Sequence, residues 1–409
     1  MTTSHRLPLL RDHHNHPSTY AAMNGCLDIR HITDKRRAIE LIREREDPLV
    51  FVLGWNNSLY RFDASELERM PPVFICNHAL HEFLINKGAE QLLGDRYLEV
   101  VANVGDGGWV QRNIAKILGL IVTVRGCDAE SLSEFYRGIL ELGVWSAEDM
   151  LLPSGDTANT FANSGLWHRT RLWADPDVYL SMSDSSRDLV HGIKLFADGA
   201  LAAQTAALTV PYLSGKREFL FRTDDQLMEL LERIGDFGKP VAIHAVGDCA
   251  SQQVIRVAGR ARRQLSSCPA IRMEHCPFLD RVQALEAKDL GITLSMQPNF
   301  SSESVDYRDR LSEDLCAVNQ PFRMLIDRAG FVPGEDLLFG SDEMPQGVEF
   351  ALQMSLFPPY PEQRLTLEEF QAGYCLEDET FGHIEVEIDE DRRSVQAEVV
   401  IARPSNDQM

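Results

Sequence analysis

Short apolar runs alternate with longer amphipathic stretches along most of the chain. The runs predict β-strands at Pro8–Leu10, Val50–Leu53, Val73–Cys76, Leu98–Val104, Ile121–Val124, Ile193–Phe196, Val241–Ile243, Ile271–Met273, Ile292–Met296 and Leu337–Phe339. The stretches Asp225–Ile234, Gln252–Gln264 and Leu367–Tyr374 have the spacing of helices that bury one face. Because strands and helices alternate, the pattern predicts an α/β fold with a parallel sheet and helices outside it.

The predicted strands outnumber the eight that a single (β/α)8 TIM barrel needs. We therefore assign some of those between Val50 and Val124 to an insertion at about residues 50–125, within a barrel domain that spans residues 1–382. The tail has a different pattern, because apolar and acidic residues alternate from His383 and a polar turn follows. This period of two predicts a β-hairpin over residues 383–409, with a domain boundary near Gly382.

The charge balance is strongly acidic. The chain has 40 Lys and Arg residues against 62 Asp and Glu residues, which gives a formal net charge of −22 and a pI of about 4.9. Nucleic acids and anionic membranes bind basic surfaces, so this balance argues against both as partners. The sequence also has no run of 18 apolar residues that would predict a membrane-spanning helix.

The eight cysteines are scattered, without a Cys-x-x-Cys pair. This spacing is typical of reduced thiols, and not of a disulfide framework or a structural zinc site. The first 16 residues lack the apolar segment of a signal peptide. Together these features predict a cytoplasmic protein.

A histidine-rich segment, Asp12-His13-His14-Asn15-His16, directly follows the first apolar run. On a strand, residues two apart point to the same face, so His14 and His16 could bind one metal ion together. A solvated histidine cluster, or the remains of an expression tag, explains the same segment equally well.

Lys194 lies inside the apolar strand that ends at Phe196. A lysine is rarely buried without a partner, so this position needs an explanation. The side chain either reaches past the strand to water or to an aspartate, or it takes part in chemistry at the strand.

Three further ionisable residues stand at the ends of later strands: His244, His275 and Asp342. Taken singly, a histidine there is most often a core or cap residue, and an aspartate is most often a helix N-cap. Taken together they favour a common site, because the C-terminal ends of barrel strands converge and bring distant residues together.

Four imidazoles, one carboxylate and one lysine are the groups that a two-metal hydrolytic site would use, provided that carbon dioxide converts Lys194 into an anionic bridging carbamate. Two divalent ions in such a site acidify a water molecule and polarise the carbonyl that it attacks. Asp342 could take the proton from that water and hand it to the leaving amine.

The segment KLFADGAL, which begins at Lys194, resembles the block around the metal-bridging lysine of amidohydrolase family 3, a branch of the amidohydrolase superfamily. This family includes formamide deformylase-like and aminoacylase-like hydrolases. Its later strand-end motifs are similar to HAVGD from His244, RMEH up to His275, QP from Gln297 and GSD up to Asp342. The resemblance covers roughly residues 10–375.

The resemblance implies a role for each matching residue. The implied metal ligands are His14 and His16 with Asp342 for the first ion, Lys194 as the bridge, and His244 with His275 for the second. The implied catalytic residues are Asp342 and His81, and the implied substrate contacts are Trp55, Asn86, Asp198 and Gln297. The implied cofactor is a divalent metal, with zinc expected, at one or two ions per chain.

The small β-sandwich of the family is expected to be truncated here, because only about ten residues precede the metal motif. The C-terminal hairpin is then a remnant of that sandwich, paired with little else. An exposed strand edge favours dimerisation unless charge blocks it, and the Glu and Asp residues of the hairpin fit the second case. For the whole chain we expect a homo-oligomer, most simply a dimer.

We therefore expect a metal-dependent amidohydrolase that uses a metal-activated water to hydrolyse a non-peptide carbon–nitrogen bond in an amide, formamide or carbamate-like small molecule. Two alternatives stay open. The same centre supports deamination or isomerisation, and a catalytically silent barrel could act as a binding protein. The complete ligand set argues against the silent barrel, whereas only the substrate pocket separates hydrolysis from deamination or isomerisation.

Overall fold

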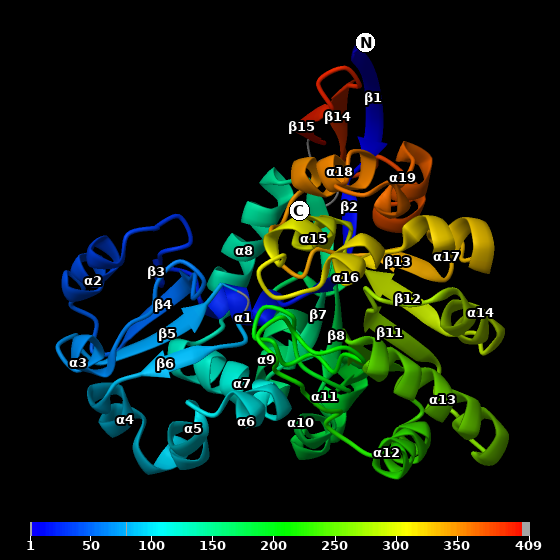
Figure 1. Cartoon of the computed structure of the whole chain (residues 1–409). Helices are drawn as coiled ribbons and strands as arrows, with labels where there is room; N and C mark the ends of the chain where they lie inside the picture. The colour runs from blue at the N-terminus through cyan, green and yellow to red at the C-terminus, as the bar shows by residue number, and fades with distance from the viewer. Residues whose placement is uncertain (1, 79, 403–409) are drawn as a thin grey trace.

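Figure 1 shows the computed structural model of the chain, which describes residues 2–78 and 80–402. Its main body is a sheet of eight parallel strands that closes nearly into a barrel. In spatial order the strands are β2 (Leu10–Asn15), β7 (Val144–Leu152), β8 (Thr170–Ala174), β9 (Val190–Phe196), β10 (Val241–Ala245), β11 (Ile271–His275), β12 (Thr293–Met296) and β13 (Leu337–Phe339). This is the (β/α)8 TIM barrel that the sequence predicts.

The barrel closes between its first and last strands, β2 and β13. The amide of Asp342 donates a hydrogen bond to the carbonyl of His14 at 2.7 Å. The carboxylate of Asp12 accepts hydrogen bonds from the amide of Ser341 at 2.9 Å and from its hydroxyl at 2.5 Å. Closure therefore brings the first predicted metal motif against the last one.

Helices surround the barrel and its loops. The longer ones are α8 (Ala129–Glu141), α9 (Gly155–Asn163), α12 (Asp224–Phe237), α13 (Asp248–Gln264), α14 (Arg281–Asp289), α17 (Phe322–Ala329), α18 (Val348–Leu356) and α19 (Leu367–Tyr374). The shorter ones are α1 (Pro17–Ala22), η2 (Trp167–Arg169), α10 (Pro176–Ser181), α11 (Asp184–Leu189), η3 (Pro298–Ser302), α15 (Glu303–Asp306), α16 (Glu313–Val318) and η4 (Pro361–Gln363). The three predicted helices are confirmed within α12, α13 and α19.

A second sheet lies beside the barrel and is coloured blue to cyan in Figure 1. Its strands, in order, are β3 (Leu27–Asp28), β4 (Val50–Trp55), β5 (Val73–Asn77) and β6 (Phe83–Ile85). Its helices are α2 (Lys35–Arg43), α3 (Ala64–Leu67), α4 (Lys87–Leu93), η1 (Gly94–Tyr97), α5 (Leu98–Asn103), α6 (Gly107–Arg112) and α7 (Ile114–Arg125). Because β3 belongs to this sheet, the insertion begins near Leu27, earlier than the predicted residue 50.

Two predicted strands are wrong, and two barrel strands were not predicted. The run Leu98–Val104 forms α5, and Ile121–Val124 lies within α7. The α7 helix is buried on more than one side between the insertion and the barrel, so its apolar residues show no clear helical period. The sequence missed β7 and β8 because polar and charged residues, such as Glu148 in the interior of β7, interrupt their apolar character.

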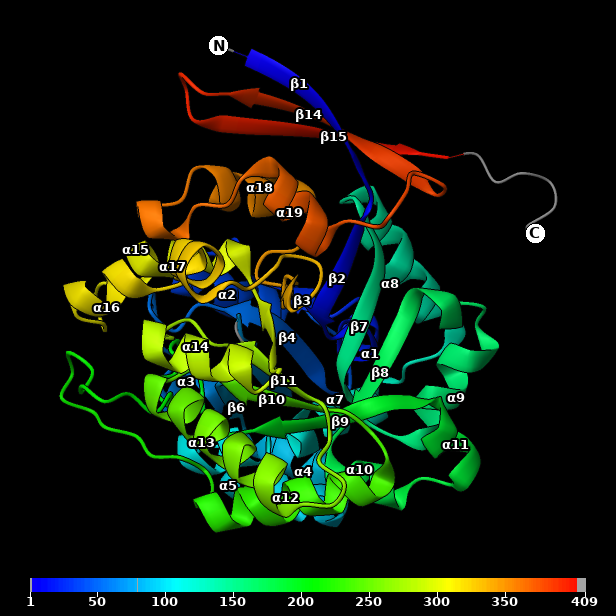
Figure 2. The ribbon, with the colours of Figure 1, turned by 90° about the vertical axis from the view of Figure 1, so that its right-hand side faces the viewer.

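Strands from the first and the last part of the described chain form a third sheet, whose strands run across the top of Figure 2. The predicted hairpin is confirmed as β14 (Gly382–Asp389) and β15 (Ser394–Ile401), and residues 403–409 lie outside the described residues. The expectation that it pairs with little else is wrong, because β1 (Thr2–Pro8) pairs antiparallel with β14 along its whole length. The few residues before the metal motif thus suffice for one strand.

None of the helices in residues 2–78 and 80–402 is both long and apolar enough to cross a membrane. The eight cysteines are all free thiols, and Cys76, Cys276 and Cys316 are buried.

Candidate metal centre

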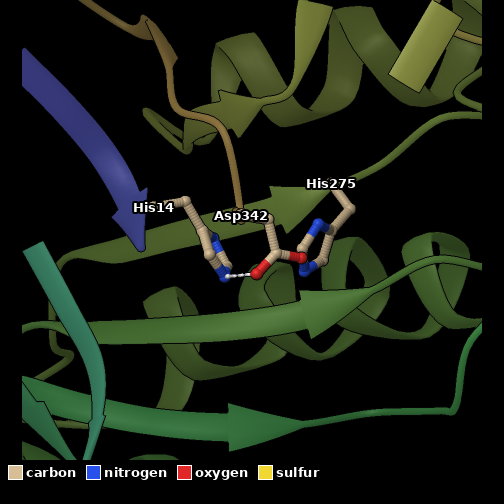
Figure 3. A group of neighbouring side chains, drawn as sticks. All are labelled: His14, His275 and Asp342. Atoms are coloured by element: carbon tan, nitrogen blue, oxygen red, sulfur yellow. Dashed lines mark ion pairs between the residues drawn. The ribbon is translucent and has the colours of Figure 1, made fainter. Parts of the chain in front are cut away.

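Three of the predicted ligands converge at the C-terminal end of the barrel strands. His14 lies on β2, His275 is the last residue of β11, and Asp342 follows β13. One ligand atom from each lies within 4.8 Å of the other two, and Nε2 of His14 is 3.7 Å from Oδ1 of Asp342 (Figure 3). This spacing fits one ion bound by two imidazoles and a carboxylate.

His275 and Asp342 share an unusual backbone conformation. Their φ angles are 72° and 52°, in the left-handed region that residues other than glycine rarely adopt. Such conformations persist where the surroundings fix them, and they concentrate at functional sites. At Asp342 the fixing contact is the hydrogen bond from its amide to the carbonyl of His14 across the barrel seam.

His16 and His244 flank this group. Nε2 of His16 is 3.2 Å from Oδ1 of Asp342, so His16 reaches the same carboxylate as His14. The ring centroids of His244 and His275 are 4.6 Å apart. Nε2 of His244 lies 3.0 Å from the carbonyl of Gly199 and donates to it, which leaves the lone pair of this neutral ring on Nδ1.

Lys194 is only 1% exposed in the middle of the barrel. Among the described residues its Nζ has no hydrogen-bond partner, and it lies over the ring of Phe196, 5.3 Å from the ring centroid. Burial lowers the pKa of Lys194 to about 8. A buried amine without a partner is costly, and a lowered pKa makes the neutral, nucleophilic form accessible.

Three of these histidines, His14, His244 and His275, are neutral at ordinary pH. Burial lowers the pKa of His14, of His244 and of His275, the last to about 3. Neutral imidazole is the form that binds a metal. Burial opposes ionisation of Asp342, but His14 and His16 beside it lower its pKa overall and keep it a carboxylate.

Two buried side chains orient the ligand rings from behind. Glu274 accepts a hydrogen bond from Nδ1 of His14 at 2.6 Å, and Gln297 accepts one from Nδ1 of His275 at 2.8 Å. In each ring the proton therefore sits on Nδ1 and the lone pair on Nε2. Gln297, expected to contact substrate, is placed by the structure behind a ligand.

A buried ion-pair network extends from Glu274 through the barrel. Arg272 donates to Glu274 at 2.5 Å and to Glu148 at 2.9 Å. Glu148 also accepts hydrogen bonds from Nδ1 of His13 and from the indole of Trp173. The sequence did not point to Glu148 because β7 was not predicted. The signal that could have identified it is an acidic residue inside the segment that ends Met150-Leu151-Leu152.

His81 faces the proposed ligands from the insertion, with its ring centroid 6.3 Å from that of His244. Its Nδ1 donates to Gln111 at 2.7 Å, and Gln111 donates back to its carbonyl. The residue before it, Leu80, has a φ of 54°. Leucine thus adopts the backbone conformation that glycine would adopt more easily, and its side chain lines the same cavity as His81.

The remaining predicted substrate contacts lie away from the ligands or face another way. Trp55 is buried in the core of the insertion, where its indole donates to the carbonyl of Tyr60. Asn86 caps α4 by accepting from the amide of Ala89 and donates to the carbonyls of Leu67 and Pro71. All polar atoms of the Asn86 side chain are used within the insertion, so it supports structure there.

Asp198 is fully buried beside β10 and accepts three backbone hydrogen bonds, from Ala207, Val246 and Gly247. Burial raises its pKa to about 7, although the three amides act in the opposite direction. Its carboxylate ties the loops after β9 and β10 together, and so supports the backbone next to His244.

The predicted ligands surround a small cavity of about 40 Å³, which we call the chamber. Its polar side is formed by His14, His16, Lys194, His244, His275 and Asp342. Its apolar side is formed by Tyr20, Leu80, Ile114, Leu118, Leu151 and Phe196. The chamber has room for ions, waters and a small group, whereas ligand pockets for larger molecules reach several hundred Å³, at roughly 300–1,000 Å³.

The model of the amidohydrolase family matches residues 147–342 of this chain. A protein of Bacillus subtilis (strain 168), "Putative amidohydrolase YtcJ", is 29% identical over 139 residues, which is 33% of this chain and 26% of that protein. The matched part therefore spans about a quarter of the length of this relative.

Two solved structures from archaea have the same fold. An uncharacterized metal-dependent hydrolase from Pyrococcus horikoshii OT3 superposes with a TM-score of 0.64 at 20% identity, over 86% of this chain and 74% of that one. One from Pyrococcus furiosus gives 0.65 at 20% identity, over 90% of this chain and 80% of that one.

Proposed function

Because residues 147–342 match the model of the amidohydrolase family, we propose that the chain is a metal-dependent hydrolase of a carbon–nitrogen bond in a small amide, formamide or carbamate-like molecule. The observation that carries the proposal is the convergence of His14, His275 and Asp342 around the buried, unpartnered Lys194. A structural core would not leave a lysine amine without a hydrogen bond among neutral imidazoles.

The donor set fits divalent ions, with zinc as the first choice. His14, His16 and Asp342 would hold one ion, His244 and His275 a second, and Lys194 as a carbamate would join them. An unmodified ammonium would repel two cations, whereas its carbamate supplies negative charge and two oxygen ligands. Ions bound there would lower the pKa of a water and polarise the scissile carbonyl.

Asp342 would move the proton. Its carboxylate lies beside His14 and His16, and it lines both the chamber and the cavity next to it. It would accept the proton of the attacking water and deliver it to the leaving amine. His81, fixed by Gln111 through Nδ1, lies on the opposite wall with the lone pair of its neutral ring on Nε2, and would accept a hydrogen bond from the amide N–H of the substrate.

The test combines metal analysis with a substrate screen. Purified protein should contain one or two divalent ions per chain. A chelator should abolish the hydrolysis of N-formyl and N-acetyl amines, and added zinc should restore it. Ring deamination and isomerisation substrates serve as comparisons in the same screen. Full activity in metal-free protein would overturn the proposal.

A further inference from the structure

The chamber opens into a second cavity of about 40 Å³, which we call the throat. The two share His81, His244, His275, Asp342 and Met344, so they adjoin at the proposed ligands. The throat in turn shares Phe300, Glu303, Tyr307 and Met344 with an outer cleft of about 530 Å³. Chamber, throat and cleft thus form one path from solvent to the metal centre.

The wall of the throat is apolar except at one position. Besides the shared histidines and Asp342, it is lined by Ala200, Leu201, Ala202, Val246, Pro277 and Phe300. Glu303, the first residue of α15, is the single carboxylate there that is not a proposed metal ligand. The hydroxyl of Tyr307 donates a hydrogen bond to it. Every substrate that reaches the chamber by this path passes the Glu303 carboxylate.

Glu303 forms no ion pair with any described residue. The outer cleft contains two arginines, but each already has a carboxylate partner outside that cleft. Arg30 contacts Asp28 through two nitrogens, at 2.9 and 2.6 Å. Arg310 contacts Asp309 in the same way, at 2.8 and 3.0 Å. The charge of Arg310 lowers the pKa of Glu303, but by less than Asp306 and Asp342 raise it.

The surroundings of Glu303 add negative charge. Burial raises the pKa of Glu303 to about 8, and the charges of Asp306 and Asp342 act in the same direction. Glu343 lines the same cleft, and its Oε1 is buried without a hydrogen-bond partner among the described residues. A cation in the throat would relieve this repulsion. Because the apolar wall has a low dielectric constant, the attraction between the cation and the Glu303 carboxylate would be strong there.

We propose that the substrate carries a protonated amine, which Glu303 binds in the throat while the scissile amide group reaches the proposed metal centre. This inference rests on the proposed function and deepens it. The substrate class is a mono-N-acylated diamine or a similar amide with a cationic group. N-acyl amino acids, whose free carboxylate would face Glu303, are disfavoured.

The experiment compares three formamides of equal length that differ only at the far end: N-formyl-1,4-diaminobutane, N-formylpentylamine and N-formyl-5-aminopentanoate. With zinc-loaded protein, above the pKa of Glu303, kcat/KM should fall in the order cation, neutral, anion. A charge-assisted hydrogen bond corresponds to a preference of roughly 10- to 100-fold for the cation over its neutral isostere. The kcat/KM values of mono-N-formylated diamines with shorter and longer chains would indicate the distance from the throat to the scissile bond.

Variants assign the preference to Glu303. Glu303→Gln should reduce the cation-to-neutral ratio to near one, and Glu303→Lys should reverse the order so that the anionic formamide is best. Asp314→Asn, at an exposed carboxylate of α16 that lines neither the throat nor the outer cleft, is the control and should keep the wild-type ratio. Melting temperatures close to that of wild type would show that each variant folds.

A binding measurement separates this inference from the proposed function. Titration of metal-free protein with butylammonium should show binding that Glu303→Gln weakens about 10-fold or more and Asp314→Asn does not. If no formamide is hydrolysed but this binding pattern is seen, the proposed reaction fails and the cation site stands. Equal turnover of the cationic and neutral formamides, or butylammonium binding unchanged in Glu303→Gln, would overturn the cation site.

Discussion

The barrel face and the insertion both carry residues that the sequence nominates for chemistry, yet the structure treats them differently. On the barrel face, residues as far apart as His14 and Asp342 lie side by side. In the insertion, Trp55 packs in the insertion's own core and Asn86 caps a helix. Of these three predicted residues only His81 faces the predicted metal centre. The proposed chemistry therefore belongs to the barrel, and the insertion supplies a wall.

The physical reason for the difference is topology. Parallel strands in a closed barrel all end at one rim, so a polar residue at a strand end is placed near the others by the fold itself. An insertion has its own sheet and its own hydrophobic core, and the spacing of its apolar residues does not indicate which side chains face the barrel. The contrast between the two regions can be tested by comparing substitutions in each.

The largest effect is expected at Asp342. Asp342→Asn keeps the size of the side chain but removes the base, so turnover of a hydrolysed formamide should fall by about 10²–10⁴-fold, the usual contribution of general acid–base catalysis. Metal content, measured by mass spectrometry, should stay largely as in wild type. A variant with an unchanged rate would remove the proton-transfer role from Asp342.

The same rim shows which parts of the site could be predicted from the sequence and which could not. The strand that ends at His244 could be predicted because its apolar run is continuous up to the histidine, and those of Lys194, His275 and Asp342 because short apolar segments lie close to the ionisable residue. The strand with Glu148 could not, since its interior charge is compensated by Arg272, a partner 124 residues away that no local pattern reveals. Orienting contacts of this kind require tertiary structure.

The next effect is expected at Glu274, behind the metal ligands. Glu274→Gln removes the charge that holds His14 in its tautomer, and metal affinity should fall by roughly 10- to 100-fold. Competition with a fluorescent zinc chelator measures this directly. Glu148→Gln, one step further along the same network, is the control and should change zinc affinity less. Equal losses in both variants would mean that the network acts as a whole and not through His14.

A smaller, conditional effect concerns Lys194. Since the pKa of Lys194 is lowered to about 8, the amine is mainly ammonium below that pH and mainly neutral above it. Only the neutral form adds carbon dioxide, so chelator-stripped protein should regain zinc and activity more fully with bicarbonate, and faster as the pH rises through 8. Labelled bicarbonate should give a carbamate carbon signal in the NMR spectrum.

Lys194→Met is the control for the carbamate, because it keeps the length and apolar stem of the side chain without the amine. It should show neither the carbamate signal nor any response to bicarbonate. Bicarbonate-independent reloading of the wild type, with no carbamate signal, would show that Lys194 is not carboxylated.

The smallest effect on catalysis is expected in the insertion. Asn86→Ala removes an N-cap and leaves the carbonyls of Leu67 and Pro71 without their donor, so the protein should lose roughly 1–3 kcal/mol of stability. Below the melting temperature, KM and kcat should stay close to wild type, because the side chain lines neither the chamber nor the throat. Urea denaturation followed with steady-state kinetics at low temperature separates the two effects. A raised KM with unchanged stability would place Asn86 at the substrate and remove the distinction between the barrel face and the insertion.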